Sequence, residues 1–253
     1  MSQKPLDKEE IKKMKEVCKL AAKVLQHTGH FAKSGISTLE LDKIADDHTL
    51  SLGAVSACTG YHGYPFSTCI SVNDVVCHGL PGDYILKDGD ILNIDVTLKK
   101  DGFFGDTSKT IIVGKVPDST IKLVECAYQA MMIGIEAIKP GGWTGDIGFE
   151  TNKYVTRLGY STIKEIGGHG IGRVFHTDPF VPAFGKKGKG ERLMPWTCFT
   201  VEPMVNEGTD EFIEYPIHGS SIKYYRTADQ KLSAQFEHTI LMTDSGYEIL
   251  TEI

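Results

Sequence analysis

The sequence lacks a disulfide framework, a long apolar run and an excess of positive charge. Its six cysteines, at positions 18, 58, 69, 77, 126 and 198, form no Cys-x-x-Cys pair, and such scattered cysteines are typical of free thiols in a reducing compartment. No stretch approaches the ~20 apolar residues that a membrane span requires. The charged start, MSQKPLDKEEIKKMKE, contains no apolar segment of the kind found in secretory signals. We therefore expect a cytoplasmic protein that has no disulfide and does not associate with a membrane.

The charge balance argues against a nucleic-acid partner. The formal net charge is −6, whereas nucleic-acid binders carry a basic stripe or patch. The exception, KKGKG at 186–190, is interpreted as a solvated loop. With 41% hydrophobic and 24% charged residues the composition is that of a globular protein. Because no Ser/Gly-rich or charged linker divides the chain, we predict one catalytic domain over 1–253, with a short N-terminal helical lead-in over about 1–35.

Helices are predicted by capping patterns and apolar spacing. Asp7 with Glu10, and Ser37 with Glu40, are capping-box pairs that each open a helix. Short β-rich runs separated by turn signals follow, and strand patterns return late in the chain. The order of helices, strands, helices, strands indicates two halves of similar construction. The predicted helices cover 8–32, 37–52, 118–138 and 144–158, and the predicted strands lie within 68–114, 197–206 and 234–242.

Two aspartates stand out in the first strand region. In ILNIDVTL the apolar residues alternate on one face, so Asp95 shares the other face with Asn93 and Thr97. Asp106 follows eleven residues later, beyond the turn KKDGFFG, which is the separation that brings two side chains together across a hairpin. Two ionised carboxylates held side by side repel, so such a pair shares a proton or surrounds a cation. From these two positions alone, exposed strand and turn residues remain an alternative.

The second half adds a histidine and two more acids. His169 lies in the glycine-rich EIGGHGIGRVFH, which predicts a loop, and His176 follows it. Glu202 in FTVEPMV and Glu237 in QFEHTI repeat the pattern of an acid within an apolar strand. Such a set of ligands suits borderline divalent ions such as Mn, Fe, Co or Zn in a two-metal site, whereas a structural zinc would use Cys and His at short spacing. Two cations lower the pKa of a water between them, so hydrolysis is the reaction class that we predict.

Beyond these residues, the sequence resembles the methionine aminopeptidases, specifically the bacterial type I form. The resemblance covers nearly the whole chain and implies the pita-bread fold, an α+β fold of two pseudo-symmetric halves with an antiparallel sheet and outer helices. The type II enzymes carry a large helical insertion between their two C-terminal glutamates, and the 35 positions from Glu202 to Glu237 leave no room for it. The matching segments are TGYHGYPFSTCISVNDVVCHGLP, GDILNIDVT, FGDTSKT, GGHGIGRVFH, TVEPMV and LSAQFEHTIL.

The resemblance implies a role for each ligand. Asp95 would bind one metal, Asp106 and Glu237 would bridge both, and His169 and Glu202 would complete the shell of the other. Glu202 would also carry a proton from the bridging water to the leaving amine. The cofactors implied are two divalent ions, from among Co, Mn, Fe, Ni and Zn.

The resemblance also implies the residues that contact the substrate. His78 would lie near the scissile amide, and His176 would hydrogen-bond the carbonyl as the oxyanion forms. Bacterial members usually place a tryptophan shortly before LSAQFEHT; this sequence reads GSSIKYYRTADQ there, so Tyr224 or Tyr225 is expected in its place. The methionine side chain would fill a small apolar pocket, because a thioether packs well against aromatic rings. The pocket residues implied are Cys58, Tyr61, Tyr64, Cys69 and Phe175.

The function implied is removal of the initiator methionine from new polypeptides whose second residue is small and uncharged. The partners would be polypeptide N-termini emerging from ribosomes, and the enzyme would be a monomer. Two alternatives remain: a non-catalytic protein of this fold that has lost its metals, and a metal-independent hydrolase of the creatinase kind. All five ligand residues are present, which disfavours the first alternative.

Overall fold

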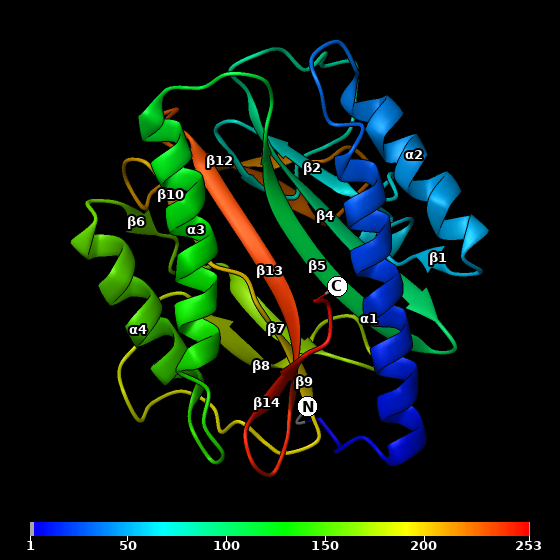
Figure 1. Ribbon diagram of the computed structural model, residues 1–253, viewed down its shortest axis with the longest axis vertical. Coiled ribbons are helices and arrows are strands. Elements are labelled where there is room, and N and C mark those ends of the chain that lie inside the picture. The colour runs from blue at the N-terminus through cyan, green and yellow to red at the C-terminus, as the bar shows by residue number, and fades with distance from the viewer. Residues whose placement is uncertain (1–2, 253) are drawn as a thin grey trace.

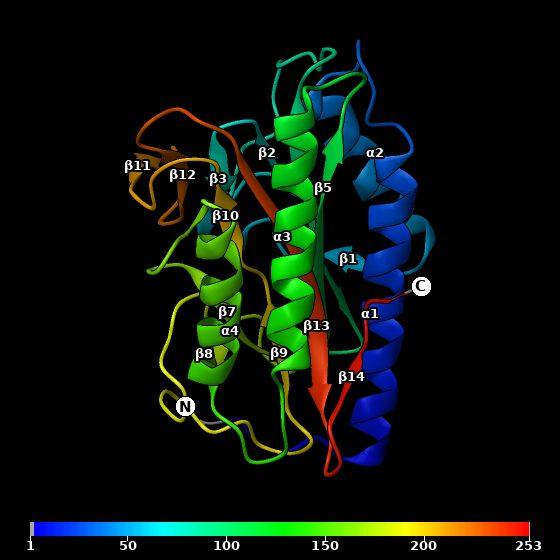
Figure 2. The ribbon, with the colours of Figure 1, turned by 60° about the vertical axis from the view of Figure 1, so that its left-hand side comes forward.

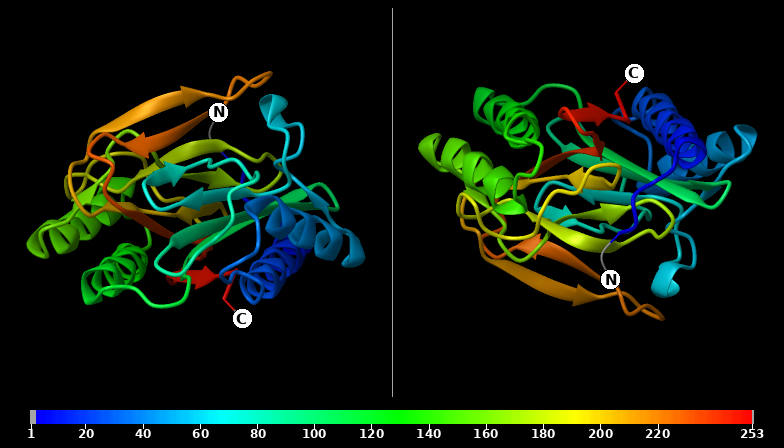
Figure 3. Two further views of the ribbon diagram at one scale, coloured as in Figure 1. Left: turned by 90° about the horizontal axis from the view of Figure 1, so that it is seen from above. Right: turned by 90° about the horizontal axis from the view of Figure 1, so that it is seen from below.

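Two pairs of helices cover one face of a large antiparallel sheet in the computed structural model, which describes residues 3–252 (Figure 1). Helices α1 (Lys8–Gly29) and α2 (Thr38–Ser51) cover one half, and α3 (Asp118–Glu136) and α4 (Thr144–Arg157) cover the other. The views in Figure 2 and Figure 3 place the helices on one side of the sheet and a β-hairpin on the other. Within the described residues, no helix is both long enough and apolar enough to cross a membrane.

The predicted helix starts are confirmed by their caps. The Asp7 carboxylate accepts from the amides of Glu9 and Glu10, and the Glu10 side chain accepts from the Asp7 amide. Ser37 and Glu40 form the same reciprocal pair before α2, and such a cap typically stabilises a helix by ~1 kcal/mol. The first helix ends at Gly29, three residues before the predicted end.

The large sheet contains eleven strands within the described residues and joins both halves of the chain. Its central order is β1-β4-β5-β13-β9-β7-β8, and all of its pairs are antiparallel. A separate sheet has the order β11-β12-β3. The strands are β1 (Val55–Ser56), β2 (Cys69–Val72), β3 (Val75–Cys77), β4 (Ile91–Lys100), β5 (Phe103–Ile112), β6 (Ser161–Thr162), β7 (Gly167–Ile171), β8 (Thr177–Pro182), β9 (Cys198–Val201), β10 (Met204–Asn206), β11 (Phe212–Pro216), β12 (Lys223–Thr227), β13 (Ser233–Met242) and β14 (Tyr247–Ile249).

The core lies between the helices and the sheet, and it determines which strand face carries the polar residues. The alternating apolar residues of β4 are at most 1% exposed and pack in one cluster with α1 and α2. Helix α1 passes so close to β5 that a Cβ at Gly105 would lie 2.8 Å from the Cys18 amide nitrogen. The apolar faces of β4 and β5 therefore pack against the helices. The carboxylates of Asp95 and Asp106 point to the opposite face of the sheet. All six cysteines are buried and unpaired.

Candidate active site

One cavity of about 310 Å³ is lined by every side chain that the sequence proposed for the site. The lining comes from both halves of the chain, so the complete set exists only in the folded protein. The twelve are Cys58, Tyr61, Tyr64, Cys69, His78, Asp95, Asp106, His169, Phe175, His176, Glu202 and Glu237.

The β4–β5 hairpin brings the two aspartates together. Asp106 lies opposite Thr97, and Asp95 lies opposite Ser108, so the two acids are diagonal neighbours on one face. In addition to burial, the Asp106 carboxylate is close enough to raise the pKa of Asp95, and the Thr97 hydroxyl donates to Asp106 Oδ1 at 2.7 Å. The hairpin predicted between them is confirmed.

Strand β13 adds the third acid from the other end of the chain. Glu237 lies opposite Ser108 of β5, which itself lies opposite Asp95 of β4. Asp95, Ser108 and Glu237 therefore form a row across three adjacent strands. Asp106 is two residues along the middle strand on the same face, so it lies between the strands that carry the other two acids.

Two local predictions were wrong. Glu202 is not within a strand but in the break between β9 and β10, because Pro203 has no amide hydrogen with which to continue the ladder. His169 is not in a loop but in β7. The neighbouring glycines allow close strand packing there: a Cβ at Gly168 would lie 2.2 Å from the Thr200 carbonyl oxygen.

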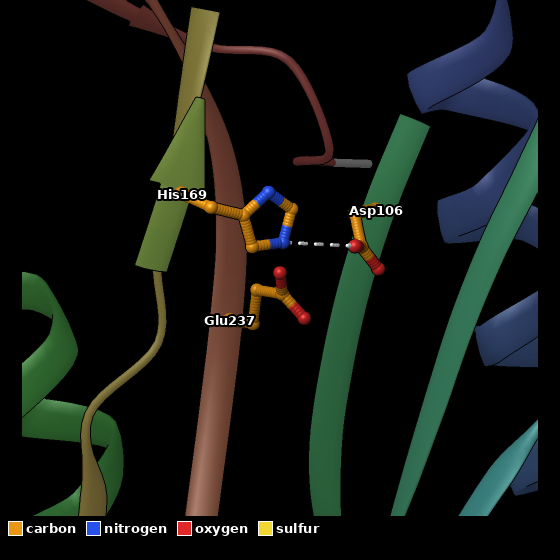
Figure 4. A group of neighbouring side chains, drawn as sticks. All are labelled: Asp106, His169 and Glu237. Carbon is orange, nitrogen blue, oxygen red and sulfur yellow. Dashed lines mark ion pairs between the residues drawn. The ribbon is translucent and has the colours of Figure 1, made fainter. Parts of the chain in front are cut away.

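His169 faces the acids at distances that suit a shared cation (Figure 4). Its Nε2 atom lies 3.7 Å from Asp106 Oδ2 and 3.7 Å from Glu202 Oε1. This is too long for a hydrogen bond and shorter than ~4.2 Å, the largest separation of two ligands that each lie ~2.1 Å from one ion. Potential ligand atoms of Asp106, His169 and Glu237 all lie within 4.8 Å of one another.

The pKa values of the buried acids are strongly raised. Burial raises the pKa of Asp106 to about 7 and that of Glu202 to about 8. Burial and the neighbouring Asp106 carboxylate also raise the pKa values of Asp95 and Glu237 well above the usual range. The Oδ1 atom of Asp95 is buried without a hydrogen-bond partner. So many carboxylates in one buried place favour a divalent cation, which would neutralise them and satisfy the unpartnered oxygen.

The protonation state and hydrogen bonding of His169 suit a metal ligand. Burial lowers the pKa of His169 to about 4, so the ring is neutral near pH 7. Its Nδ1 atom lies 3.1 Å from the carbonyl oxygen of Gly170. With the proton on Nδ1 donated to that carbonyl, the Nε2 lone pair faces the acids.

Three polar side chains that the sequence did not propose support the acids. Besides Thr97, the Thr200 hydroxyl donates to Glu202 Oε1 at 2.7 Å, and Gln235 Nε2 donates to Glu202 Oε2 at 3.1 Å. Strand alternation could have indicated two of them: Thr97 and Gln235 are each two residues from a proposed ligand in the same strand and share its face. Thr200 lies two residues before Glu202, near the end of β9.

The other two histidines are fixed by neighbours outside the acid cluster. His78 has a φ of 55°, unusual for a residue other than glycine, and its Nδ1 atom lies 3.0 Å from the carbonyl oxygen of Lys223. His176 Nδ1 lies 3.0 Å from the Tyr61 hydroxyl, and the His176 ring is 4.1 Å from that of His169. Burial lowers the pKa values of His78 and His176, which favours neutral rings.

An apolar pocket forms another part of the cavity wall. Cys58, Tyr64, Cys69 and Phe175 are buried in one cluster, and the Tyr61 ring packs 4.7 Å from that of Phe175. Neither tyrosine expected in place of the missing tryptophan lines the cavity. Ile222 does so instead, while Tyr224 packs against the cluster and stacks on Tyr215.

Comparison with known proteins agrees with the site. Residues 12–244 match the model of metallopeptidase family M24. The chain is 48% identical over 245 residues to the methionine aminopeptidase of Escherichia coli K12, covering 96% of this chain and 91% of that protein. It is 46% identical to methionine aminopeptidase A of Synechocystis, covering 97% and 96%.

Solved structures give the same result. The methionine aminopeptidase of Rickettsia prowazekii matches with a TM-score of 0.95 and 41% identity, covering 99% of this chain and all of that one. A prolidase of Pyrococcus horikoshii, at 19% identity and a TM-score of 0.77 over 98% of this chain and 63% of that one, shares the fold. The pita-bread prediction is confirmed, and the chain belongs to metallopeptidase family M24 and, within it, to the methionine aminopeptidases.

Proposed function

We propose that the protein removes the initiator methionine from nascent polypeptides whose second residue is small and uncharged. The observation that carries this proposal is one cavity in which a cluster of buried acids adjoins an apolar pocket. Family membership supports the reaction class, and the pocket supports the identity of the side chain.

The acids and His169 would hold two divalent ions. Asp106 is proposed as one bridge because it lies between the strands of Asp95 and Glu237, and Glu237 as the other. Asp95 would bind one ion alone, and His169 and Glu202, which lie 3.7 Å apart, would bind the second. When bound, such a pair lowers the pKa of water and polarises the scissile carbonyl.

The apolar pocket would select methionine. Its wall combines aromatic rings with thiols, and an unbranched thioether makes favourable contacts with such a surface. A charged side chain would lose its hydration without gaining a partner there. A β-branched side chain has less freedom to adapt to a narrow pocket.

Three side chains would handle the proton and the developing charge. Glu202, in the acid cluster, is proposed to take a proton from the attacking water and deliver it to the leaving amine. His176 would donate a hydrogen bond to the carbonyl oxygen as negative charge develops on it. His78, held by the Lys223 carbonyl, would contact the amide of the second residue.

The test is peptide hydrolysis by protein reconstituted with each of Co, Mn, Fe, Ni and Zn in turn. We expect Met-Ala-Ser to release methionine and Leu-Ala-Ser and Met-Lys-Ser to react far more slowly. Failure to release methionine with any metal, or equal release of leucine, would refute the proposal. Activity that survives exhaustive EDTA treatment would instead favour the metal-independent alternative.

The same proposal includes the setting in which the enzyme works. Its substrates would be polypeptide N-termini emerging from ribosomes in the cytoplasm, and one chain, acting as a monomer with a single catalytic domain, would suffice. Sedimentation of the active protein tests the last point, because activity confined to a dimer fraction would contradict it.

A further inference from the structure

A buried aspartate outside the cavity is the centre of a hydrogen-bond network that the mechanism above does not use. Asp42 lies on α2 and is 7% exposed. Its Oδ1 atom accepts from the Thr68 amide at 2.8 Å and hydroxyl at 2.7 Å, and from the Ser67 hydroxyl at 2.8 Å and amide at 3.1 Å. Four donors from two consecutive residues therefore converge on one carboxylate oxygen.

The network reaches two of the chain segments that form the apolar pocket, those of Cys58 and Cys69. Ser67 and Thr68 directly precede Cys69, a pocket residue. The Ser67 carbonyl oxygen accepts from the Ser56 hydroxyl at 2.7 Å, and the Ser56 hydroxyl oxygen accepts from the Cys58 amide at 3.1 Å. The segment that contains Cys58 is thereby tied to the segment that contains Cys69.

Tyr64 connects the network to a third chain segment beside the cavity, the one that contains His78. Its buried hydroxyl lies 3.0 Å from the carbonyl oxygen of Thr68 and 3.0 Å from that of Gly79, the residue after His78. None of Asp42, Ser56, Ser67 and Thr68 lines the cavity. Their side chains can affect a bound substrate only by placing the residues that do.

Helix α2 gives this network a rigid base. Leu41 is fully buried and Ala45 is 1% exposed, both in the main core cluster, and the capping box at Ser37 fixes the start of the helix. A carboxylate on such an element can hold a loop in one position, since side chains placed by packed helices are more precise than those placed by loops. Without it, the Ser67 and Thr68 amides and the Thr68 hydroxyl would lose their acceptor, and the Ser67 hydroxyl would keep only the Asp42 backbone carbonyl oxygen. Buried donors without an acceptor would force the loop to move.

We propose that Asp42 is a positioning residue that sets the shape of the apolar pocket, and hence the selectivity of the enzyme for the side chain of the first residue of its substrate. This inference rests on the proposed function, because it takes the pocket to be the methionine site. It is distinct from the metal ligands, none of which Asp42 contacts in the hydrogen bonds described above.

The experiment compares Asp42→Ala with Asp42→Asn in the metal-reconstituted full chain. The readout is the ratio of kcat/KM for Met-Ala-Ser to kcat/KM for Leu-Ala-Ser. We expect Asp42→Ala to lower the ratio at least tenfold, mainly by raising KM for the methionine peptide. Asp42→Asn should restore most of the ratio, since the amide oxygen can still accept from Thr68.

Asp90→Ala is the matched control. Asp90 is 2% exposed and accepts from the Lys87 amide, the Tyr84 hydroxyl and Asn73 Nδ2, but it does not line the cavity. Asp90→Ala should lower the melting temperature as much as Asp42→Ala does. It should leave the ratio of the two kcat/KM values unchanged. Ser56→Ala removes the hydroxyl that joins the Ser67 carbonyl to the Cys58 and Thr59 amides and leaves the bonds to Asp42 in place. It should fold normally and lower the ratio severalfold, and it tests the inference if Asp42→Ala does not fold.

Different results would refute the proposed function and the inference about Asp42. A wild-type protein that releases no methionine overturns the proposed function and this inference with it. Wild-type release combined with an unchanged ratio in folded Asp42→Ala and Ser56→Ala overturns this inference alone. An equal fall of the ratio in Asp90→Ala also overturns it, because the effect would then be a general loss of stability.

Discussion

In the metal-free protein, the buried acid Asp106 should make a contribution to stability that falls as the pH rises. The buried carboxyl of Asp106 has its pKa raised from 3.8 to about 7, so the folded metal-free protein holds a proton that the unfolded chain releases near pH 4. This group therefore favours folding fully below about pH 4, and its contribution is lost as the pH rises through about 7. Glu202, with a pKa raised to about 8, acts in the same direction.

The size of the effect follows from the pKa values. The difference between 3.8 and about 7 corresponds to about 4 kcal/mol at ~1.4 kcal/mol per pH unit, and a change from pH 5 to pH 7 should remove roughly 2–3 kcal/mol of it. For a chain of this size ~1 kcal/mol shifts the melting temperature by ~2–4 °C. We therefore expect Asp106 to lower the melting temperature by roughly 5–10 °C between pH 5 and pH 7 relative to Asp106→Asn. The buried histidines, such as His169 with its pKa lowered to about 4, act in the opposite direction in both proteins, so the comparison with the variant isolates the aspartate.

Thermal unfolding followed by circular dichroism measures this directly, on EDTA-treated and Mn-loaded protein at pH 5, 6, 7 and 8. The loaded protein should gain stability relative to the metal-free protein as the pH rises, because ligands must lose their protons to bind the ion. The melting temperature of the metal-free wild type should fall relative to that of metal-free Asp106→Asn as the pH rises. A difference between these two proteins that is constant or grows in favour of the wild type from pH 5 to pH 8 would refute the electrostatic reasoning. So would a difference between Mn-loaded and metal-free wild type that narrows.

Three substitutions test other parts of the site. Glu237→Ala should reduce bound metal, measured by elemental analysis, and abolish methionine release because a bridge is lost; undiminished metal content would contradict the bridging assignment. His78→Ala should keep the metal content and lower kcat by about 10², and loss of metal in this variant would instead place His78 among the ligands. Gly79→Ala should destabilise the fold by ~3 kcal/mol, because its Cβ would lie 2.3 Å from the Ile70 carbonyl oxygen; an unchanged denaturant midpoint would contradict that close approach.

Strand alternation and turn spacing predicted the Asp95–Asp106 hairpin, because both are local properties of the chain. The same reasoning failed for His169, where glycines that resemble a loop in sequence serve close strand packing. It also failed for Glu202, which the following proline removes from the strand. Ile222, which directly precedes β12, lines the cavity, whereas Tyr224 and Tyr225 within β12 do not. Which side chain of a segment faces a cavity depends on what the segment packs against, and the local sequence does not show this.

The sequence by itself determined the helix caps, the faces of the strands and the ordered motifs that mark the family. Only the tertiary structure decided that Glu237 pairs with Ser108 across 129 positions (237 − 108), and that Asp42 holds the loop before Cys69. Alternation tells which face of a strand a residue occupies but not which strand lies beside it. That choice depends on burying the helix-facing side of the whole sheet at once, and it is this packing that brings acids from both halves of the chain into one site.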